Sequence, residues 1–253
     1  MSGSIRQLAR PEKAFNMSGL RNGSGMTYVP MRTIYLHKGS RVAGLKRDPE
    51  EVFLSNKGYK YGISEDNLKY IKGFLQDKYR ISDELILQVL THKSFGNGIK
   101  PYNEKLSAMG AKLLNLFFAK YVVNKPSSNE LVINGKNLDV LGSPIARELC
   151  GKTSMGVFAK NNQLNSVMFW KPNTKNIGFA SSGELTISAQ VMYALVGAIT
   201  FSYGKRVAEQ FIEEKILQGN GNDTNSNKLE TIAQVVVESA TARKKSKNQQ
   251  RAE

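Results

Sequence analysis

Apolar residues recur every three or four positions over most of the chain, which is the spacing of one face of an α-helix. The longest such pattern spans residues 103–123, and its apolar positions are Leu106, Met109, Leu113, Phe117 and Tyr121. Pro126 follows the pattern. Because proline lacks the N–H that a helical hydrogen bond needs, we expect the helix to end there.

Shorter helical patterns flank this segment on both sides. Ser64 and Ser82 precede patterns that run to about residues 79 and 92, and serine is a favoured N-cap because its hydroxyl accepts a free backbone N–H. Further patterns cover residues 138–159, 185–202 and 205–217, with breaks expected at Gly142, Pro144, Gly151 and Gly204. Residues 95–102 predict a loop, and residues 167–170 a short extended or loop segment. Strand patterns are sparse, so the sequence predicts an all-α fold.

The C-terminal region changes character after residue 217. Residues 219–227 read GNGNDTNSN, which is typical of a flexible linker. Leu229, Ile232, Ala233 and Val236 then predict one short helix. We therefore expect residues 64–217 to form the folded domain, and residues 218–253 to form a linker, a short helix and a basic tail.

The charge balance indicates a polyanionic partner. Lys and Arg number 36 against 21 Asp and Glu, a net charge of +15. Neutralising phosphates releases condensed counterions, so nucleic acid is the leading partner and an anionic membrane surface the second.

The apolar stretch 113–123 is interrupted by Lys120 and is too short to cross a bilayer, so no membrane insertion is expected. The single cysteine, Cys150, excludes a disulfide within the chain, and we expect it to be a small buried apolar side chain.

The N-terminal region is basic and poor in acids. Residues 1–47 contain nine Lys and Arg, and Glu12 is their one acid. This composition, with its serines, is typical of a mitochondrial transit peptide. The sequence predicts such a peptide over residues 1–27 and a retained basic extension over residues 28–63. The alternative is a basic arm that binds RNA and is never cleaved.

Two basic clusters outside the predicted domain are candidates for RNA binding. They consist of Lys38, Arg41, Lys46 and Arg47 on the N-terminal side, and of Arg243, Lys244, Lys245, Lys247 and Arg251 at the C-terminus. Such segments bind phosphates without reading sequence and often order only on binding. The alternative is a solvated tail with no specific partner.

Three segments of the chain form a recognisable pattern. They are Thr91-His92-Lys93-Ser94-Phe95, then N-E-K-L-S-A-M-G-A-K-L-L at 103–114, and Q-V-M-Y-A-L-V-G-A at 190–198. They resemble the ribonuclease III domain, whose pattern is L-T-H-x-S-Y, then N-E-R-L-E-F-L-G-D-x-x-L, then D-x-x-E-A-L-I-G-A. Order and spacing agree across residues 64–217. The resemblance implies a helical ribonuclease III-type endonuclease domain, here with basic N- and C-terminal extensions.

Enzymes of that family hydrolyse double-stranded RNA with Mg²⁺ held by four carboxylates, because this cation prefers oxygen ligands. At the corresponding positions the chain has Ser107, Ala111, Gln190 and Tyr193. Glu104 alone matches an acidic position, and one carboxylate cannot assemble the ligand set. The resemblance therefore implies no catalytic residues, no metal and no cofactor, with Glu104 acting as a favourable acid at a helix N-terminus.

Other acids and a serine nucleophile are two conceivable substitutes for the missing carboxylates. Asp139, Glu148 and Glu184 are acidic, but nothing in the sequence places them around Ser107 and Ala111. A serine hydrolase built on Ser107 and His92 lacks the glycine pattern of a nucleophile elbow. The small residues Ala108, Gly110 and Ala111 predict instead a close approach between helices.

The family resemblance also implies partners. In the family, the helix that carries the second motif forms much of a two-fold dimer interface. Here that helix is expected over residues 103–123, so Met109, Leu113 and Phe117 are interface candidates. A degenerate site, basic extensions and an import-like N-terminus resemble the ribonuclease III-like proteins of the fungal mitochondrial large ribosomal subunit. This implies a structural role in the mitochondrial matrix, bound to ribosomal RNA, to large-subunit proteins and to a second ribonuclease III-like protein as a heterodimer. The alternatives are a mitochondrial double-stranded RNA processing factor or accessory subunit of an active ribonuclease, and an RNA chaperone outside the ribosome.

Overall fold

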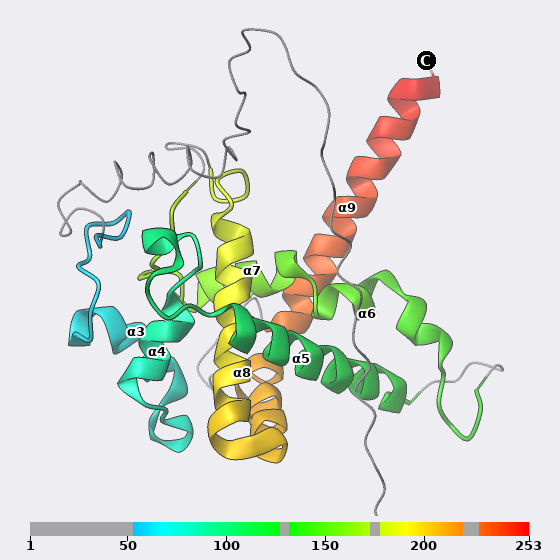
Figure 1. The fold of residues 1–253 in the computed structure, drawn as a ribbon. Helices are drawn as coiled ribbons and strands as arrows, with labels where there is room; N and C mark the ends of the chain where they lie inside the picture. The colour runs from blue at the N-terminus through cyan, green and yellow to red at the C-terminus, as the bar shows by residue number, and fades with distance from the viewer. Residues whose placement is uncertain (1–52, 127–131, 173–177, 220–227, 253) are drawn as a thin grey trace, which may run out of the picture. The chain divides into compact units, whose positions relative to one another are not determined.

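A computed structural model describes residues 53–126, 132–172, 178–219 and 228–252 (Figure 1). The predicted transit peptide and most of the predicted extension, with Lys38, Arg41, Lys46 and Arg47, lie outside the described residues and stay predictions. Within the described ranges the chain is helical, and its β-structure is limited to three isolated bridges. The all-α fold class is confirmed.

The first helices begin at the serines that the sequence indicates. The Ser64 hydroxyl accepts the Asn67 N–H at 3.3 Å and caps α3 (Glu65–Leu75). Ser82 likewise caps α4 (Asp83–Leu90), accepting the Leu85 N–H at 3.4 Å. The pattern that runs to residue 79 is two elements, because the chain turns at Gln76 (φ 56°) before the short helix η1 (Asp77–Tyr79).

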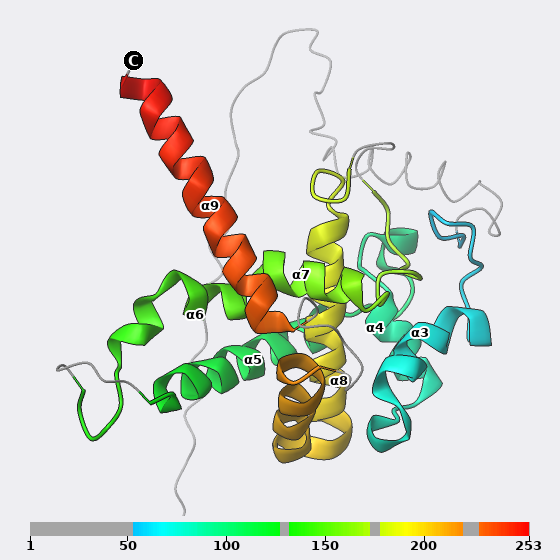
Figure 2. The same cartoon turned by 180° about the vertical axis from the view of Figure 1, so that it is seen from behind.

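Two long helices form the centre of the domain. α5 (Glu104–Asn124) ends before Pro126 as expected, and α8 (Glu184–Phe211) continues into a π-helical turn, η4 (Ile212–Leu217). α8 is interrupted at Gly204 (φ 82°, ψ 174°), which is the predicted break and a conformation that glycine adopts without steric cost. α5 and α8 make the most extensive helix contact of the described chain and cross one another in both views (Figures 1 and 2).

Short elements complete the domain between α5 and α8. The predicted breaks divide residues 138–159 into η3 (Asp139–Gly142), α6 (Pro144–Leu149) and α7 (Lys152–Asn161), and α7 packs along α8. The expected loop at 95–102 contains a short 3₁₀ turn, η2 (Phe95–Gly98). Of the two expectations for residues 167–170, an extended or a loop segment, the structure has extended backbone at Phe169, which pairs with Thr91 in a parallel bridge.

The folded unit extends beyond the expected limits of residues 64 and 217. Tyr61 stacks on Phe95 with ring centroids 5.4 Å apart and meets Phe169 edge-on at 5.1 Å. At the other end Leu229 and Ile232 are buried in the core. Local periodicity predicts a helix from Leu229 but does not show that either addition packs on the domain, because both depend on contacts distant in sequence.

The C-terminal segment differs from the expected short helix and tail. α9 (Leu229–Ala252) is one helix that continues through the basic run. Its Lys, Arg, Gln and Ala residues all have good helix propensity, which favours continuation. Figures 1 and 2 show its second half running away from the other labelled helices.

By length and hydropathy alone, α5 and α8 could each cross a membrane. They pack on one another inside one domain, which gives a second reason for their apolar composition. Two thirds of the most apolar stretch of α8 is buried in the chain, compared with one third for α5. The absence of membrane insertion stays a prediction.

Candidate functional site

Two glycines bring the first and last motif segments into backbone contact. A Cβ atom on Gly110 of α5 would lie 1.9 Å from the Tyr193 carbonyl oxygen, and one on Gly197 of α8 would lie 2.0 Å from the Leu106 carbonyl oxygen. Both distances are far below van der Waals contact, so only glycine fits at either position. The predicted close approach is therefore observed at Gly110, whereas Ala108 is exposed and Ala111 half-buried.

The five positions taken from the family pattern lie on these two helices. Glu104 is exposed at the start of α5, Ser107 and Ala111 follow on the same helix, and Gln190 and Tyr193 lie on α8. Ser107, Ala111 and Gln190 are half-buried, and Tyr193 is buried. The α5–α8 contact brings the two segments together, as the resemblance implies.

Tyr193 connects α8 to the turn between α6 and α7. Its hydroxyl donates to the carbonyl oxygen of Cys150 at 2.8 Å. Burial raises the pKa of Tyr193 strongly, and the nearby Cys150 and Glu148 raise it further. The hydroxyl therefore stays protonated and acts as a hydrogen-bond donor, which is a structural role.

Glu148 is the acid that sequence reasoning could not place. Its Oε1 accepts hydrogen bonds from the N–H and the hydroxyl of Ser154, at 3.2 and 3.1 Å, in the first turn of α7. A carboxylate in this position satisfies an N–H that has no helical partner. Glu148 lies before the helix and outside the usual N-cap position, so no local sequence pattern predicts that it caps α7.

Glu104 pairs with a lysine of the first motif. Its carboxylate lies 2.8 Å from the Lys93 ammonium, and this hydrogen bond and charge lower the pKa of Glu104. Both side chains are more than half exposed, so the pair contributes little to stability. The predicted position at a helix N-terminus is confirmed.

His92 is held by Ser94 rather than by Ser107. The His92 Nδ1 lies 2.8 Å from the Ser94 hydroxyl, whose oxygen also accepts the Lys171 N–H at 3.0 Å. Burial lowers the pKa of His92, and the Lys93 charge lowers it further. This cluster ties the first motif to the segment after Phe169.

No grouping of three or more His, Cys, Asp or Glu able to hold a metal occurs in the described part of the chain. The expectation of no metal and no cofactor stays a prediction.

Cys150 is half-buried, and burial raises the pKa of its thiol to about 12. The thiol therefore stays protonated, which agrees with its expected role as an apolar side chain.

The candidates for a dimer interface divide into two groups. Met109 and Phe117 are half-buried on α5, but Leu113 is only 8% exposed and packs in the chain's own core. Leu113 is therefore not a surface residue. Leu116 on the same helix is 45% exposed, and sequence reasoning missed it.

The basic candidates on α9 are accessible. Arg243, Lys244 and Lys245 are exposed, and Lys247 lies on the same helix, although its side chain is outside the described residues. The helix is fixed at its start by Glu230, which accepts hydrogen bonds from the Tyr121 hydroxyl at 2.9 Å and the Lys125 ammonium at 2.6 Å. Burial raises the pKa of Glu230, but these two bonds outweigh it and hold the pKa below its usual value.

Comparison with known proteins identifies a family and several similar proteins. The sequence profile of the Ribonuclease-III-like family matches residues 82–220. Large ribosomal subunit protein mL57 of Neurospora crassa is 28% identical over 152 residues, which cover 56% of this chain and 57% of that protein. The match thus spans little more than half of that relative.

Two solved structures of the nuclease domain of ribonuclease III from Campylobacter jejuni are also similar. One is a crystal structure at 2.2 Å resolution, 21% identical, and the other describes structural flexibility in its region involved in dimer formation, 22% identical. Both have a TM-score of 0.44 and cover 58% of this chain, with 92% and 94% of their own lengths covered.

Proposed function

The chain belongs to the Ribonuclease-III-like family, and from that membership we propose that it is a non-catalytic structural protein of the mitochondrial large ribosomal subunit. The relative mL57 is a large ribosomal subunit protein by name. The observation that carries the non-catalytic part is Tyr193, whose hydroxyl is bound to the Cys150 carbonyl oxygen where the family pattern has a metal-binding acid.

The loss of the carboxylates suits a structural role. Paired acids repel one another and are costly to desolvate when no metal compensates their charge. Ser107, Ala111, Gln190 and Tyr193 carry no charge at neutral pH, so the α5–α8 contact packs without a metal. Glu148, an acid beside Tyr193, already accepts hydrogen bonds from the N-terminus of α7. We propose that double-stranded RNA is not hydrolysed here.

Ribosomal RNA is the proposed polyanion. The net charge of +15 supports it, and the exposed bases Arg243, Lys244 and Lys245 on α9 supply contacts to phosphates. Lys38, Arg41, Lys46 and Arg47 are proposed to do the same on the N-terminal side. Residues 1–27 are proposed to direct import into mitochondria, because their composition is that of a transit peptide.

The exposed face of α5 supports a protein partner. Leu116 is 45% exposed between the half-buried Met109 and Phe117, and only a third of the most apolar stretch of α5 is buried in the chain. Apolar surface of this kind marks association sites. We propose a second ribonuclease III-like protein as the heterodimer partner, seated on this face.

A sucrose gradient of a mitochondrial lysate in moderate salt with Mg²⁺ tests the ribosomal role. The chain should sediment with large-subunit ribosomal RNA and should leave that fraction when the RNA is digested. A light peak free of ribosomal RNA would overturn the ribosomal assignment and favour a processing factor or an RNA chaperone.

A cleavage assay tests the non-catalytic role separately. The purified chain, given double-stranded RNA and Mg²⁺, should leave the RNA intact under conditions in which an active ribonuclease III degrades it. Cleavage that disappears on chelating Mg²⁺ would contradict the proposal.

Co-purification tests the proposed partner. The tagged chain with wild-type α5 should co-purify with a second ribonuclease III-like protein, and the Leu116→Asp variant should not.

A further inference from the structure

The end of α8 exposes aromatic side chains that packing within the chain does not explain. All residues from 201 to 206, F-S-Y-G-K-R, are exposed at the Gly204 break. Phe201 is 73% exposed, which is the highest value for a large apolar side chain among the described residues, and Tyr203 is 43% exposed. An exposed phenylalanine costs solvation free energy unless a partner covers it.

A groove lies beside these aromatic residues. It has a volume of about 460 Å³ and runs between the α8 end and the segment that leads into α4. The lining residues are Arg80, Ile81, Ser82, Glu84, Leu85, Gln88, Phe201, Ser202 and Tyr203. The Tyr203 hydroxyl donates to the Arg80 carbonyl oxygen, so the two walls are tied together.

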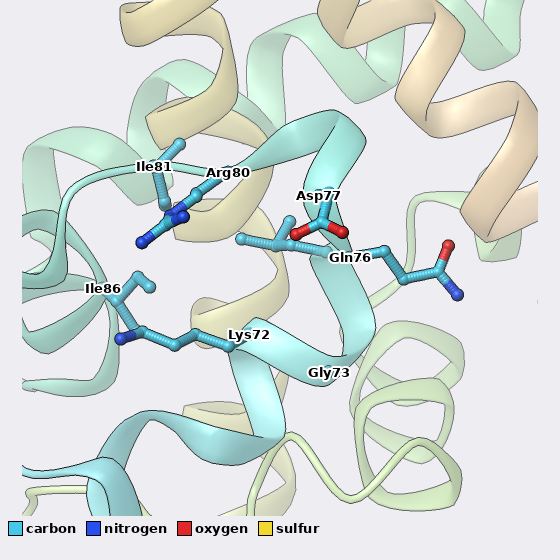
Figure 3. A pocket seen from close by; sticks show the side chains of 8 residues that line it. Lys72, Gly73, Gln76, Asp77, Arg80, Ile81 and Ile86 are labelled. Carbon is cyan, nitrogen blue, oxygen red and sulfur yellow. The ribbon is translucent and has the colours of Figure 1, made fainter.

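A second cavity of about 310 Å³ shares Arg80 and Ile81 with this groove. Figure 3 shows the Arg80 guanidinium and the Lys72 side chain on the same side of this cavity as Ile81 and Ile86, away from Asp77 and Gln76. Lys72 is paired with Asp83 at 2.8 Å. Arg80 has no acid within ion-pair distance in the described ranges, so its charge is available to a ligand.

This combination of chemistry fits unpaired RNA. A single-stranded nucleic acid is held by bases stacked on aromatic rings and by phosphates at arginine. Phe201 offers an open ring, Arg80 an unpaired guanidinium, and Lys205 and Arg206 add positive charge just beyond the break. Ser82, Glu84, Gln88 and Ser202 add polar groups to the wall, with which an unpaired base can form hydrogen bonds.

We propose that the groove between Arg80 and Phe201 binds an unpaired nucleotide of structured RNA, with the base on the Phe201 ring and the adjoining phosphate at Arg80. The proposal rests on the proposed RNA-binding function and adds a second kind of contact to it. The basic arms hold phosphates of any RNA, whereas this groove selects a strand whose base is free. It lies about 12 Å along α8 from Tyr193, given the rise of 1.5 Å per residue, and is separate from the degenerate family site.

The test uses the full chain and two RNA probes of one sequence. One probe is a 12-nucleotide single strand with a central 2-aminopurine, whose fluorescence falls when the base stacks, and the other is the same strand fully paired. Phe201→Ala should weaken single-strand binding about tenfold, in line with the loss of one stacked base, and abolish the fluorescence change. Binding of the duplex should not change.

Matched variants separate stacking from apolar contact and from folding. Phe201→Trp keeps a stacking ring and should bind like the wild type, whereas Phe201→Leu keeps apolar bulk alone and should resemble Phe201→Ala. Arg80→Ala should weaken single-strand binding and reduce its salt dependence. Ile99→Ala removes another exposed apolar side chain, 59% exposed, and should have no effect. Far-ultraviolet circular dichroism checks that each variant is folded.

Three results would overturn the inference. If the wild type binds both probes and Phe201→Ala binds the single strand equally well, the groove is rejected as a binding site, but the RNA-binding function is not. Full binding by Phe201→Leu would indicate an apolar protein contact instead of a stacked base. Failure of the wild type to bind either probe would reject the RNA-binding function together with the groove.

Discussion

The α5–α8 contact and the second half of α9 are both built from long helices, but the first is packed tightly inside the domain and the second is exposed. At the contact, Gly110 and Gly197 bring two backbones together, and neither position leaves room for a single added carbon. On α9, every side chain described from Glu238 onward is exposed, and five bases follow with no acid among residues 239–252. One region is defined by shape and the other by charge.

The difference shows which substitutions each region tolerates. A steric change at the α5–α8 contact alters folding stability, because protein interiors are close-packed and adjust only in part. A change of charge on the second half of α9 leaves the fold intact and alters only affinity for a polyanion. The two regions can therefore be tested independently, by unfolding for the first and by binding for the second.

Gly110→Ala should have the largest effect. Its Cβ would lie 1.9 Å from the Tyr193 carbonyl oxygen, which is backbone and cannot rotate away. We expect a loss of about 3 kcal/mol in the free energy of unfolding, measured by chemical denaturation. Gly73→Ala on α3 is the matched control, since its Cβ would meet nothing within 4 Å, and it should stabilise the chain by up to about 1 kcal/mol. Equal midpoints for the two variants would contradict the close contact.

Replacing Arg243, Lys244 and Lys245 by glutamine should have the next largest effect, on binding alone. We expect RNA affinity to fall by roughly ten- to a hundredfold in low salt, and the logarithmic salt slope to decrease by about 2 to 3, since each released phosphate contact contributes about 0.9. Fluorescence anisotropy titrations at several salt concentrations measure both. Alanine at Ser246, Asn248 and Gln249 on the same helix is the control, and a similar loss there would show that helix structure, rather than charge, governs binding.

Tyr193→Phe should have a moderate effect on stability. The variant loses the bond to the Cys150 carbonyl oxygen and leaves that acceptor unpaired in a partly buried site, which costs about 1 to 2 kcal/mol. Urea denaturation measures the loss. Tyr70→Phe is the control, because the Tyr70 hydroxyl makes no hydrogen bond within the described residues, and it should be neutral. A neutral Tyr193→Phe would mean that the tie to the α6–α7 turn is dispensable.

Glu230→Gln should have the smallest effect. Glu230 and Lys125 are 38% and 51% exposed, so water screens the pair and the expected loss is about 0.5 kcal/mol. Because the folded pKa of Glu230 is lowered, the stabilisation is present above the unfolded value of about 4.3 and disappears as pH falls through the lower folded value. Wild type and variant should therefore differ at pH 7 and converge in acid, whereas the exposed Glu238→Gln should match the wild type at both. A constant difference across that range would rule out the ion pair as the cause.

The elements could be predicted where a local signal decides them. Ser64 and Ser82 cap helices through their own hydroxyls, and Gly204 breaks α8 through its own backbone, so neighbouring residues suffice. The length of α9 could not be predicted in this way. A dense basic run suggests repulsion and disorder, whereas helix propensity and the anchored first turn favour continuation.

The candidate site was predictable only in part. The family pattern located Gly110, Ser107 and Tyr193, but the bond from Tyr193 to Cys150 spans 43 positions, and no spacing rule connects them. Leu113 belongs to the same apolar helical pattern as Met109 and Phe117, yet it is buried in the chain's own core, and periodicity alone does not distinguish core from interface. Phe201 was missed for the opposite reason, since an apolar residue within a helical pattern suggests the core.

α9 is attached to the domain at one end only. Glu230 is hydrogen-bonded to the domain in the first turn, and the remaining 20 or so residues extend about 30 Å at 1.5 Å per residue. A rotation of the helix axis by about 10° at this attachment would displace the far end by about 5 Å, roughly the length of one helical turn. The packing of the first turns of α9, with Leu229 and Ile232 buried and Glu230 bonded to Tyr121 and Lys125, therefore sets where the distant basic residues lie.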